Sequence, residues 1–344
     1  MNHRKIRFGV LGAGRIGKIH CENIANRIPG AELIAVSDVV PSSAAALAAR
    51  YSGAKTLDNY KDVLASPDVD AVAICTPTNT HYQIILDAAA AGKHVFCEKP
   101  IDLSLDKIVA VQQSVERSRI HFMVAFNRRF DPNFKKVHDM VRSGKIGQAH
   151  VLRITSRDPA PPPEEYIRSS GGLFLDMTIH DFDMARYLMG REVIEVYARA
   201  KVLVDPVFER NRDWDTAVVT LTFDNGAMGI IDNSRKAIYG YDQRAEVFGS
   251  GGMVAVSNNT PDTHLYFDST GTHAALPLNF FMERYTESYL REMQAFVDAV
   301  DRNIAAPVGV KDGLMAVAIG LAAAKSAREN RPVTVAEIYQ RSAS

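Results

Sequence analysis

Short apolar, β-branched runs alternate with longer segments of helical periodicity through the first 125 residues. The strand-like runs cover residues 7–11, 33–37, 71–75, 94–97 and 120–125, and the helical segments cover residues 15–27, 42–51, 80–91 and 104–119. Alternation of this kind predicts a parallel sheet whose strands are joined by crossover helices. We therefore expect residues 1–125 to form a doubly wound α/β domain.

The pattern changes after Phe126. Helices are expected over residues 133–142 and 173–189, and strands over residues 148–156, 217–223, 227–234, 244–248 and 253–256. Residues 158–163 form a Pro-rich loop, and Asn225-Gly226 is a typical hairpin turn. Two helices, over residues 280–301 and 311–329, follow. For residues 126–344 the pattern thus predicts an α+β domain with a large, open, mostly antiparallel sheet. We expect the last helix of this domain to pack back on the first domain.

Composition narrows the classes of function. The 344 residues include 40 basic and 40 acidic side chains, so the net charge of zero argues against nucleic acid or an anionic membrane as a partner. The most apolar late segment, residues 315–324, is about half as long as a membrane span. No signal-peptide pattern is present, and three widely spaced cysteines indicate neither a disulfide framework nor a zinc site. We expect a soluble, cytoplasmic protein.

A glycine motif follows the first strand and opens the first helix. Gly12-Ala13-Gly14-Arg15-Ile16-Gly17 reads GxGxxG, the signature of a Rossmann dinucleotide site. Gly12 permits the tight turn, Gly14 lets the backbone approach a pyrophosphate, and Gly17 lets helix and strand pack closely. The expected cofactor contacts here are Gly12, Ala13, Gly14, Arg15 and Ile16.

Asp38 ends the second strand, 21 positions after Gly17. A carboxylate at this place accepts hydrogen bonds from the adenosine ribose and repels a 2′-phosphate. The next residues are Val39, Val40 and Pro41, with no Arg among them, so NAD is favoured over NADP. The alternative is an ordinary solvated acid at a strand end.

Two further loops leave strands at their carboxyl ends, where ligands of open α/β sheets bind. Cys75-Thr76-Pro77-Thr78-Asn79 follows the third strong strand, and Glu98-Lys99-Pro100 follows the next. A Lys before Pro is held extended, and Pro100 is a candidate for a cis peptide bond. Taken alone, Lys99 could be a surface lysine. The expected cofactor contacts from this region are Cys75, Thr76, Pro77, Thr78, His81, Glu98 and Lys99.

Through these motifs, and above all through Glu98-Lys99-Pro100, the sequence resembles the Gfo/Idh/MocA oxidoreductase family over nearly its whole length. Longer strings resemble the inositol 2-dehydrogenases of that family. They are residues 126–131 (FNRRFD), 156–159 (SRDP), 176–183 (DMTIHDFD) and 238–243 (IYGYDQ).

The resemblance implies a Rossmann domain joined to an open-sheet domain, an active site in the cleft between them, and a homotetramer formed through the sheet face. It implies an NAD-dependent enzyme of inositol catabolism that oxidises a ring hydroxyl of myo-inositol to the 2-keto inositol. The family triad maps onto Lys99, Asp176 and His180.

The chemistry of these residue types fits such a reaction. Asp176 and His180 are four residues apart, so on one helical face the carboxylate could orient the imidazole. His180 would accept the hydroxyl proton while Lys99 stabilises the developing alkoxide. Asp176, His180 and Asp183 together would be a candidate set of metal ligands. No second histidine is near in the sequence, however, so we expect no metal. The expected substrate contacts are Lys99, Asn127, Arg129, Asp158, Asp176, His180 and Tyr239.

Rival interpretations remain open. The substrate could instead be scyllo-inositol or an aldopyranose sugar, since fold analogy does not choose between them. A protein of another class, a non-catalytic dinucleotide sensor, would keep the glycine motif and Asp38 but would not need a base beside a lysine. Whether Tyr239 or Tyr241 reaches the substrate is also open, because Tyr241 could be a half-buried sheet residue.

Overall fold

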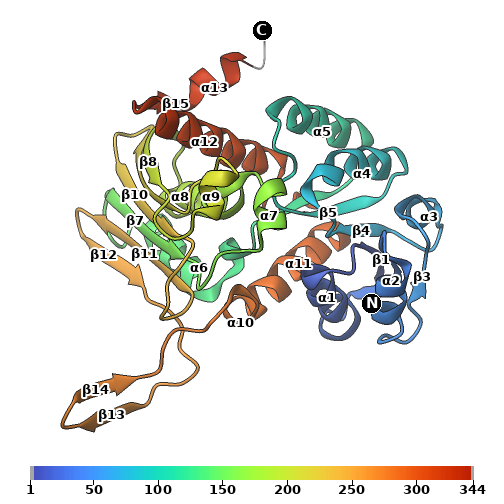
Figure 1. The fold of residues 1–344 in the computed structure, drawn as a ribbon. Coiled ribbons are helices and arrows are strands. Elements are labelled where there is room, and N and C mark those ends of the chain that lie inside the picture. The colour runs from blue at the N-terminus through green and yellow to red at the C-terminus, as the bar shows by residue number, and fades with distance from the viewer. Residues whose placement is uncertain (1–3, 342–344) are drawn as a thin grey trace. The chain divides into compact units, whose positions relative to one another are not determined.

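The computed structural model describes residues 4–341, which fold into two compact units. The first unit comprises the described residues up to Phe130 together with Glu287–Val317. The second unit comprises Asp131–Thr286 and the described residues from Ala318 onward. Each unit is built around one large sheet (Figure 1).

The sheet of the first unit is parallel and six-stranded, in the order β3-β2-β1-β4-β5-β6. Its strands are β1 Ile6–Leu11, β2 Ala31–Ser37, β3 Lys55–Thr56, β4 Ala71–Ile74, β5 His94–Glu98 and β6 Phe122–Ala125. The strand order reverses between β1 and β4, which is where ligands bind in sheets of this kind. The doubly wound prediction is confirmed. Only β3 was missed, because two residues show no periodicity.

Helices connect these strands. They are α1 Arg15–Glu22, α2 Pro41–Ala48, α3 Tyr60–Ala65, α4 Thr78–Ala90 and α5 Leu105–Ser118, with a 3₁₀ turn η2 Asn127–Phe130. The single helix expected over residues 15–27 is wrong in its second half, since Asn23–Arg27 forms a π-helical turn, η1. The returning segment adds α11 Thr286–Asp301 and the first part of α12 Val310–Glu329.

Helix α11 supplies part of the core of the first unit. The ring of Phe296 packs edge-on against Phe8 of β1 at 6.0 Å and against Phe96 of β5 at 5.8 Å between centroids. All three rings are fully buried. A segment from late in the chain thus completes a core begun by the first strand.

The sheet of the second unit has seven strands in the order β12-β11-β7-β10-β9-β8-β15. They are β7 Ala149–Arg157, β8 Val193–Lys201, β9 Thr216–Phe223, β10 Met228–Ser234, β11 Asp242–Gly249, β12 Gly252–Val256 and β15 Val333–Thr334. Only β7 and β10 pair in parallel, so the prediction of a mostly antiparallel sheet is confirmed. The turn at Asn225-Gly226 joins β9 to β10 as expected, with Gly226 at φ +83°.

Two of the helices expected in the second unit differ from the prediction, and several short helices were not expected. The helices of this unit are α6 Pro132–Arg142, α7 Glu164–Ser169, α8 Ile179–Met189, α9 Val207–Arg210, α10 Phe281–Arg284, the end of α12 and α13 Val335–Arg341. The helix expected over residues 173–189 begins instead with a π-helical turn, η3 Leu173–Met177. The helix expected over residues 280–301 is interrupted at Tyr285. A hairpin of β13 Leu265–Asp268 and β14 Gly271–Ala274 was not anticipated.

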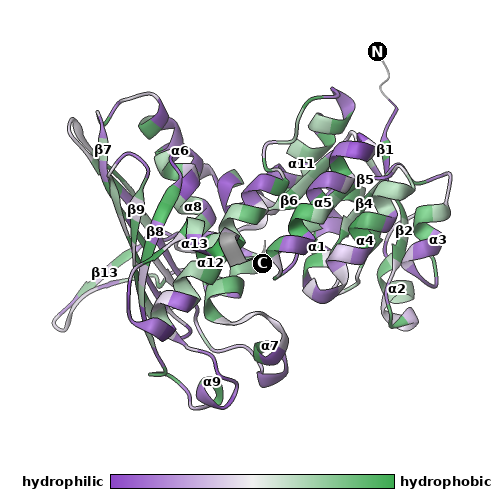
Figure 2. Ribbon diagram, turned by 90° about the horizontal axis from the view of Figure 1, so that it is seen from above, coloured by the Kyte–Doolittle hydropathy of each residue, from purple (hydrophilic) through white to green (hydrophobic). Residues whose placement is uncertain are grey.

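The two faces of the second sheet differ. Along β9, Ala217, Val219, Leu221 and Phe223 are buried, whereas Val218 between them is 51% exposed. Helices α6 and α8 lie on one face, and in the part of the chain that is described no helix covers the other (Figure 2). Several apolar side chains are exposed on strands of this sheet: Ile194, Val218, Met228, Ile230, Phe248 and Met253.

Within residues 4–341, none of the helices has both the length and the hydropathy needed to cross a lipid bilayer.

Candidate active site

The glycine motif of the first unit has the geometry of a dinucleotide loop. Gly12 has φ +102°, and a Cβ there would lie 2.6 Å from the carbonyl oxygen of Cys75. A Cβ on Gly17 would lie 1.9 Å from the carbonyl oxygen of Gly12. A Cβ on Gly14, by contrast, would meet no described atom within 4 Å. Two glycines therefore serve backbone packing, while Gly14 borders open space at the start of α1, where a pyrophosphate fits.

Asp38 is tied to the same loop. Its carboxylate accepts hydrogen bonds from the backbone N–H of Ala13 at 2.6 Å and of Val40 at 2.8 Å. An ionised carboxylate has about four acceptor positions, so acceptor capacity remains for ribose hydroxyls. Asp38 thus holds the first and second βα loops together at the edge of the sheet where the sequence predicts that the adenosine ribose binds.

His81 joins the other two loops of this edge. In α4, its Nε2 lies 2.8 Å from the carbonyl oxygen of Thr76 and its Nδ1 lies 2.8 Å from that of Pro100. The ring is buried, and burial lowers the pKa of this imidazole. His81 was expected among the cofactor contacts; the structure places it beneath the loops, linking Cys75–Asn79 to the turn after β5.

Lys99 follows β5 directly. The Lys99–Pro100 peptide bond is cis, as the sequence suggested. The preceding residue, Glu98, places its Oε1 2.9 Å from Nε2 of His20 in α1. Lys99 therefore lies between two residues that buried histidines hold in place. His20 contacts the Glu98 carboxylate before it, and His81 contacts the carbonyl of Pro100 after it.

Two predicted substrate contacts lie in η2. Asn127 is 3% exposed, and its side-chain Nδ2 has no hydrogen-bond partner among residues 4–341. Arg129 donates from Nη2 to Oδ1 of Asp312 at 2.9 Å, and that carboxylate also accepts from the N–H of Gly309. Arg129 is thus oriented by an ion pair, whereas Asn127 retains a donor group that a ligand can use.

In the second unit, a glycine and a carboxylate set the start of the predicted catalytic segment. Gly172 has φ +78°, and a Cβ there would lie 2.6 Å from Oδ1 of Asp213. That oxygen accepts the N–H of Leu173 at 2.9 Å. The N–H of Thr178 then donates to the carbonyl of Leu173, five residues back, which is the bond of a π-helical turn. Such turns are frequent at functional sites.

Asp176 lies in this π-turn and is held by two residues that the sequence analysis missed. Tyr166 of α7 donates its hydroxyl to Oδ1 at 2.7 Å, and Arg235 donates from Nη2 to Oδ2 at 2.9 Å. Arg235 also donates to Oδ2 of Asp158 at 3.1 Å. One buried guanidinium therefore brings together Asp158 and Asp176, two residues predicted separately.

Charge and burial act in opposite directions on this cluster. Burial lowers the pKa of Arg235, but the charges of Asp176 and Asp158 outweigh it, and the pKa is raised above its ordinary value. Burial raises the pKa of Tyr166, and the charge of Asp176 raises it further. The arginine stays a cation and the tyrosine a neutral donor, which favours an ionised Asp176.

His180 lies in the first turn of α8 and is half-buried. Asp176 lies four residues earlier, in the π-helical turn that precedes α8. The expectation that the two residues share one face of a regular α-helix is therefore wrong in detail. The orienting role of Asp176 stays a prediction. Asp181, beside His180, is fully buried and accepts from Nδ2 of Asn233 at 2.8 Å, which ties the start of α8 to β10.

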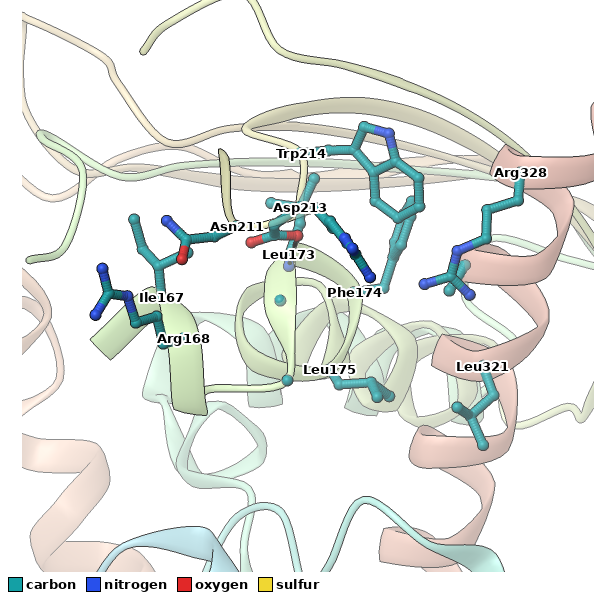
Figure 3. A pocket seen from close by; sticks show the side chains of 14 residues that line it. Ile167, Arg168, Leu173, Phe174, Leu175, Asn211, Asp213, Trp214, Leu321 and Arg328 are labelled. Atoms are coloured by element: carbon teal, nitrogen blue, oxygen red, sulfur yellow. Dashed lines mark hydrogen bonds between the residues drawn. The ribbon is translucent and has the colours of Figure 1, made fainter. Parts of the chain in front are cut away.

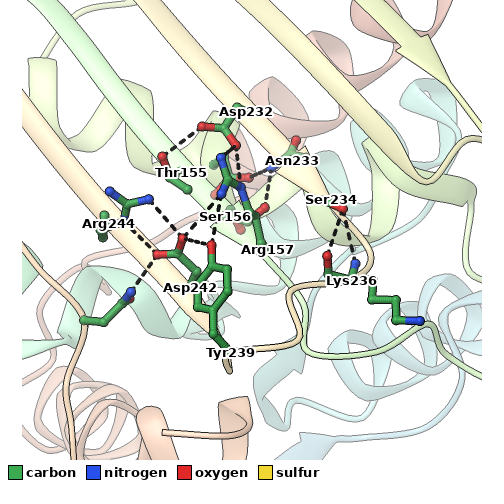
Figure 4. Close-up of polar contacts among 12 residues, drawn as sticks. Thr155, Ser156, Arg157, Asp232, Asn233, Ser234, Lys236, Tyr239, Asp242 and Arg244 are labelled. Carbon is green, nitrogen blue, oxygen red and sulfur yellow. Dashed lines mark hydrogen bonds and ion pairs between the residues drawn. The ribbon is translucent and has the colours of Figure 1, made fainter. Parts of the chain in front are cut away.

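Tyr239 and Tyr241 have different environments. The Tyr239 hydroxyl donates to Oδ2 of Asp242 at 2.7 Å and accepts from Nη1 of Arg157 at 3.0 Å (Figure 4). Tyr241 is 6% exposed and packs edge-on against Tyr285 at 5.9 Å. Tyr241 is thus a core residue, and Tyr239 is the one with a polar, half-buried hydroxyl.

A cavity of about 220 Å³ lies beside η3 in the second unit (Figure 3). Its wall includes the Asp213 carboxylate, and the guanidinium of Arg328 lies 5.5 Å from the ring centroid of Trp214. Neither Asp176 nor His180 lines it. The cavity is therefore separate from the predicted acid–base pair.

Comparison with known families follows the same division of the chain. Residues 6–126 match the oxidoreductase family with an NAD-binding Rossmann fold, and residues 134–255 match the GFO/IDH/MocA C-terminal domain.

Relatives match over nearly the full length. A myo-inositol 2-dehydrogenase of Thermotoga maritima is 48% identical over 97% of this chain and 99% of its own. An inositol 2-dehydrogenase of Rhizobium meliloti is 45% identical over 96% and 99%. Among solved structures, a scyllo-inositol dehydrogenase from Lactobacillus casei with bound NAD(H) and scyllo-inositol is 32% identical, with a TM-score of 0.91 over 97% of this chain and 100% of that one.

The glycine geometry predicts separable effects of two alanine substitutions. Gly14→Ala should change the free energy of unfolding by no more than about 1 kcal/mol, because its Cβ enters open space. It should weaken NAD binding about tenfold or more, or about 1.4 kcal/mol, because that space is where the pyrophosphate fits. Gly17→Ala is the matched variant and should lose about 1–3 kcal/mol of stability through the backbone clash. Urea unfolding and fluorescence titration with NAD measure both. Unchanged NAD affinity in Gly14→Ala would contradict the assignment.

Proposed function

We propose that this chain, which belongs to the Gfo/Idh/MocA oxidoreductase family, oxidises a ring hydroxyl of myo-inositol to the 2-keto inositol. It is an NAD-dependent polyol dehydrogenase by family, and NAD is its cofactor. The choice of myo-inositol rests chiefly on the two inositol 2-dehydrogenases that match almost the entire chain at 45% and 48% identity.

When bound, the nicotinamide accepts the hydride that leaves the hydroxyl-bearing carbon. The loop from Gly12 to Ile16 and Asp38 would hold the dinucleotide. The loops after β4 and β5, which carry Thr76 and Lys99, would border its other end. The open space at Gly14 and the two N–H groups that orient Asp38 support this assignment.

His180 is assigned as the general base. A half-buried imidazole in the first turn of a helix, four residues after a carboxylate held by two donors, can take the hydroxyl proton as hydride leaves and return it in the reverse reaction. Asp176 would favour the imidazolium that forms. The hydrogen bonds from Tyr166 and Arg235 support an Asp176 that stays ionised and fixed during this step.

Lys99 is assigned to the developing alkoxide, which a nearby ammonium stabilises electrostatically. The remaining proposed substrate contacts are Asn127, Arg129, Asp158 and Tyr239. Asn127 offers a buried amide donor, and Tyr239 a hydroxyl in a polar network. Arg129 and Asp158 are each oriented by an ion pair. Groups of this kind suit a ring of hydroxyls and would be left unpaired by an apolar alcohol.

A second candidate is oxidation of scyllo-inositol. A Bacillus subtilis scyllo-inositol 2-dehydrogenase is 36% identical over 97% of this chain, in addition to the Lactobacillus casei structure. The two substrates differ in the configuration of one carbon. The higher identity to the myo-inositol 2-dehydrogenase of Thermotoga maritima, 48% against 36%, favours myo-inositol.

The proposal extends to assembly and location. The exposed apolar side chains on β9 to β12, among them Val218, Met228 and Phe248, support a homotetramer formed through that sheet face. Cys21, Cys75 and Cys97 are free thiols, which supports a reducing, cytoplasmic location.

A substrate panel tests the function. With NAD present, we expect kcat/KM for myo-inositol to exceed that for scyllo-inositol and glucose, and to exceed that for cyclohexanol by a factor on the order of 10⁴, because unpaired buried polar groups penalise the apolar ring. Appearance of the reduced-nicotinamide absorbance is the readout. Preference for cyclohexanol would overturn the polyol assignment, and preference for scyllo-inositol would move the assignment to the second candidate.

Asp38 should determine the choice of dinucleotide. The wild type is expected to use NAD with a kcat/KM about tenfold or more above that for NADP, because the carboxylate faces the 2′-phosphate. Asp38→Asn removes the charge and keeps one acceptor oxygen for one of the two loop N–H groups, so it should narrow the ratio of the two kcat/KM values. Asp38→Ala should narrow it too and also raise KM for NAD. Steady-state kinetics with both dinucleotides decide; equal efficiency in the wild type contradicts the prediction.

His180→Ala should lower kcat by roughly 10²- to 10⁴-fold, the usual share of a positioned general base. NAD affinity should stay unchanged, because the dinucleotide contacts lie in the first unit. The acidic limb of the rate–pH profile should also vanish. His150→Ala, which removes an exposed histidine from β7, is the control and should retain full activity. Near wild-type turnover in His180→Ala would make Lys99 the candidate base.

A further inference from the structure

Three ionisable side chains converge inside the first unit: His20 from α1, Glu98 from the end of β5 and Glu292 from α11. One nitrogen or oxygen from each lies within 4.8 Å of the others. His20 and Glu292 are fully buried, and the Glu98 side chain is 14% exposed. The reaction proposed above assigns no task to His20 or Glu292.

The hydrogen bonds of this cluster are incomplete if both acids are ionised. His20 Nε2 lies 2.9 Å from Glu98 Oε1, but neither oxygen of Glu292 has a hydrogen-bond partner among residues 4–341. A buried carboxylate without donors is very unfavourable, and two carboxylates cannot bond to each other because each only accepts. A proton on Glu292 removes the charge and makes it a donor.

The tautomer of His20 agrees with this distribution of protons. Its buried Nδ1 has no partner in the described part of the chain, so a hydrogen there would be left unsatisfied. The neutral ring with its hydrogen on Nε2 satisfies the contact to Glu98. Glu98 can then accept from His20 on one side and from Glu292 on the other, and the cluster carries one negative charge.

The surroundings contain acids, thiols and rings. Cys21 belongs to α1, Cys75 follows β4, Cys97 precedes Glu98, and Tyr289 of α11 and Phe96 of β5 contact the His20 ring at 6.0 and 5.0 Å between centroids. Burial raises the pKa of Glu292 well above its usual value, and the charge of Glu98 raises it further. Burial raises the pKa of the Cys75 thiol as well, and the charge of Glu98 raises it further.

We propose that Glu292 is kept as a neutral acid that shares its proton with Glu98, and that this bond, together with His20, positions the turn carrying Lys99. Glu292 and His20 are positioning residues, since they act through Glu98, the residue before Lys99. The part concerning Lys99 rests on the function proposed above, whereas the protonation of Glu292 does not.

Stability against pH tests the proton. A glutamic acid whose folded pKa is raised stabilises the fold fully below its unfolded pKa, about 4.3, and that contribution is lost as pH rises through the folded pKa. Glu292→Gln mimics the neutral acid and cannot ionise. The unfolding equilibrium constant of the wild type, relative to Glu292→Gln, should therefore rise up to about tenfold per pH unit above pH 5. Urea unfolding without substrate measures it.

Glu287→Gln is the matched control, because Glu287 lies on the same helix but is exposed and pairs with Arg291. Its stability relative to wild type should not diverge with rising pH. Parallel pH profiles for wild type and Glu292→Gln would overturn the proposal. So would a Glu292→Gln protein that is much less stable at every pH, or a stoichiometric divalent metal in the purified wild type, because either result requires an ionised Glu292.

Activity tests the positioning. At pH 7, Glu292→Gln should retain kcat within about twofold, because its amide still donates to Glu98, whereas Glu292→Leu should lose about tenfold in kcat with KM for the polyol little changed. Equal kcat in the two variants would overturn the positioning role, and so would loss of kcat in Glu292→Gln. If Glu292→Leu fails to fold, the Glu292→Gln result decides. Absence of polyol oxidation by the wild type would refute the proposed function and leave the stability test of the proton intact.

Discussion

Two backbone hydrogen bonds that continue the parallel ladder past the ends of the strands determine the geometry of the cofactor edge. The N–H of Gly12 donates to the carbonyl of Ser37 at 2.8 Å, and the N–H of Cys75 donates to the carbonyl of Leu11 at 2.7 Å. They fix the chain after β1 against the end of β2 and the chain after β4 against the end of β1. The carbonyl of Cys75 then lies so close to Gly12 that there is no room for a side chain. Asp38 and His81 then fasten the loops to one another from outside the ladder.

In the second unit, the loops of the candidate site are held together by a charged side chain rather than by backbone hydrogen bonds. Asp158 follows β7, Asp176 lies in the π-turn, and both are drawn to Arg235, which follows β10. Without that cation, two acids close together in a largely buried site would repel each other and be driven to protonate. The arginine therefore lets the segment after Gly172 present a fixed, ionised carboxylate one turn before His180.

The sequence predicted those features that depend on local pattern. The roles of Gly12 and Gly17 follow from where a Cβ would clash, and the order of strands and helices follows from periodicity. The π-turns were not predictable, because α- and π-turns share an apolar pattern and differ by one carbonyl acceptor, as at Thr178 and Leu173. Arg235 and Tyr166 were missed because their partners are 59 and 10 residues away and they belong to no recognised motif. The sequence did offer one indication of Arg235, which is that it directly follows a predicted strand that ends at Ser234.

The return of α11 into the first unit also affects the order in which that unit can form. Phe8 and Phe96 are buried against Phe296, and Glu98 against Glu292, so the amino-terminal strands lack part of their interior until the ribosome has passed residue 296. At 5–20 residues per second, that is roughly 10–30 s after β6 emerges. During this interval Phe8 and Phe96 lack the ring that covers them in the finished protein, so the nascent chain exposes aromatic surface that the folded chain buries completely.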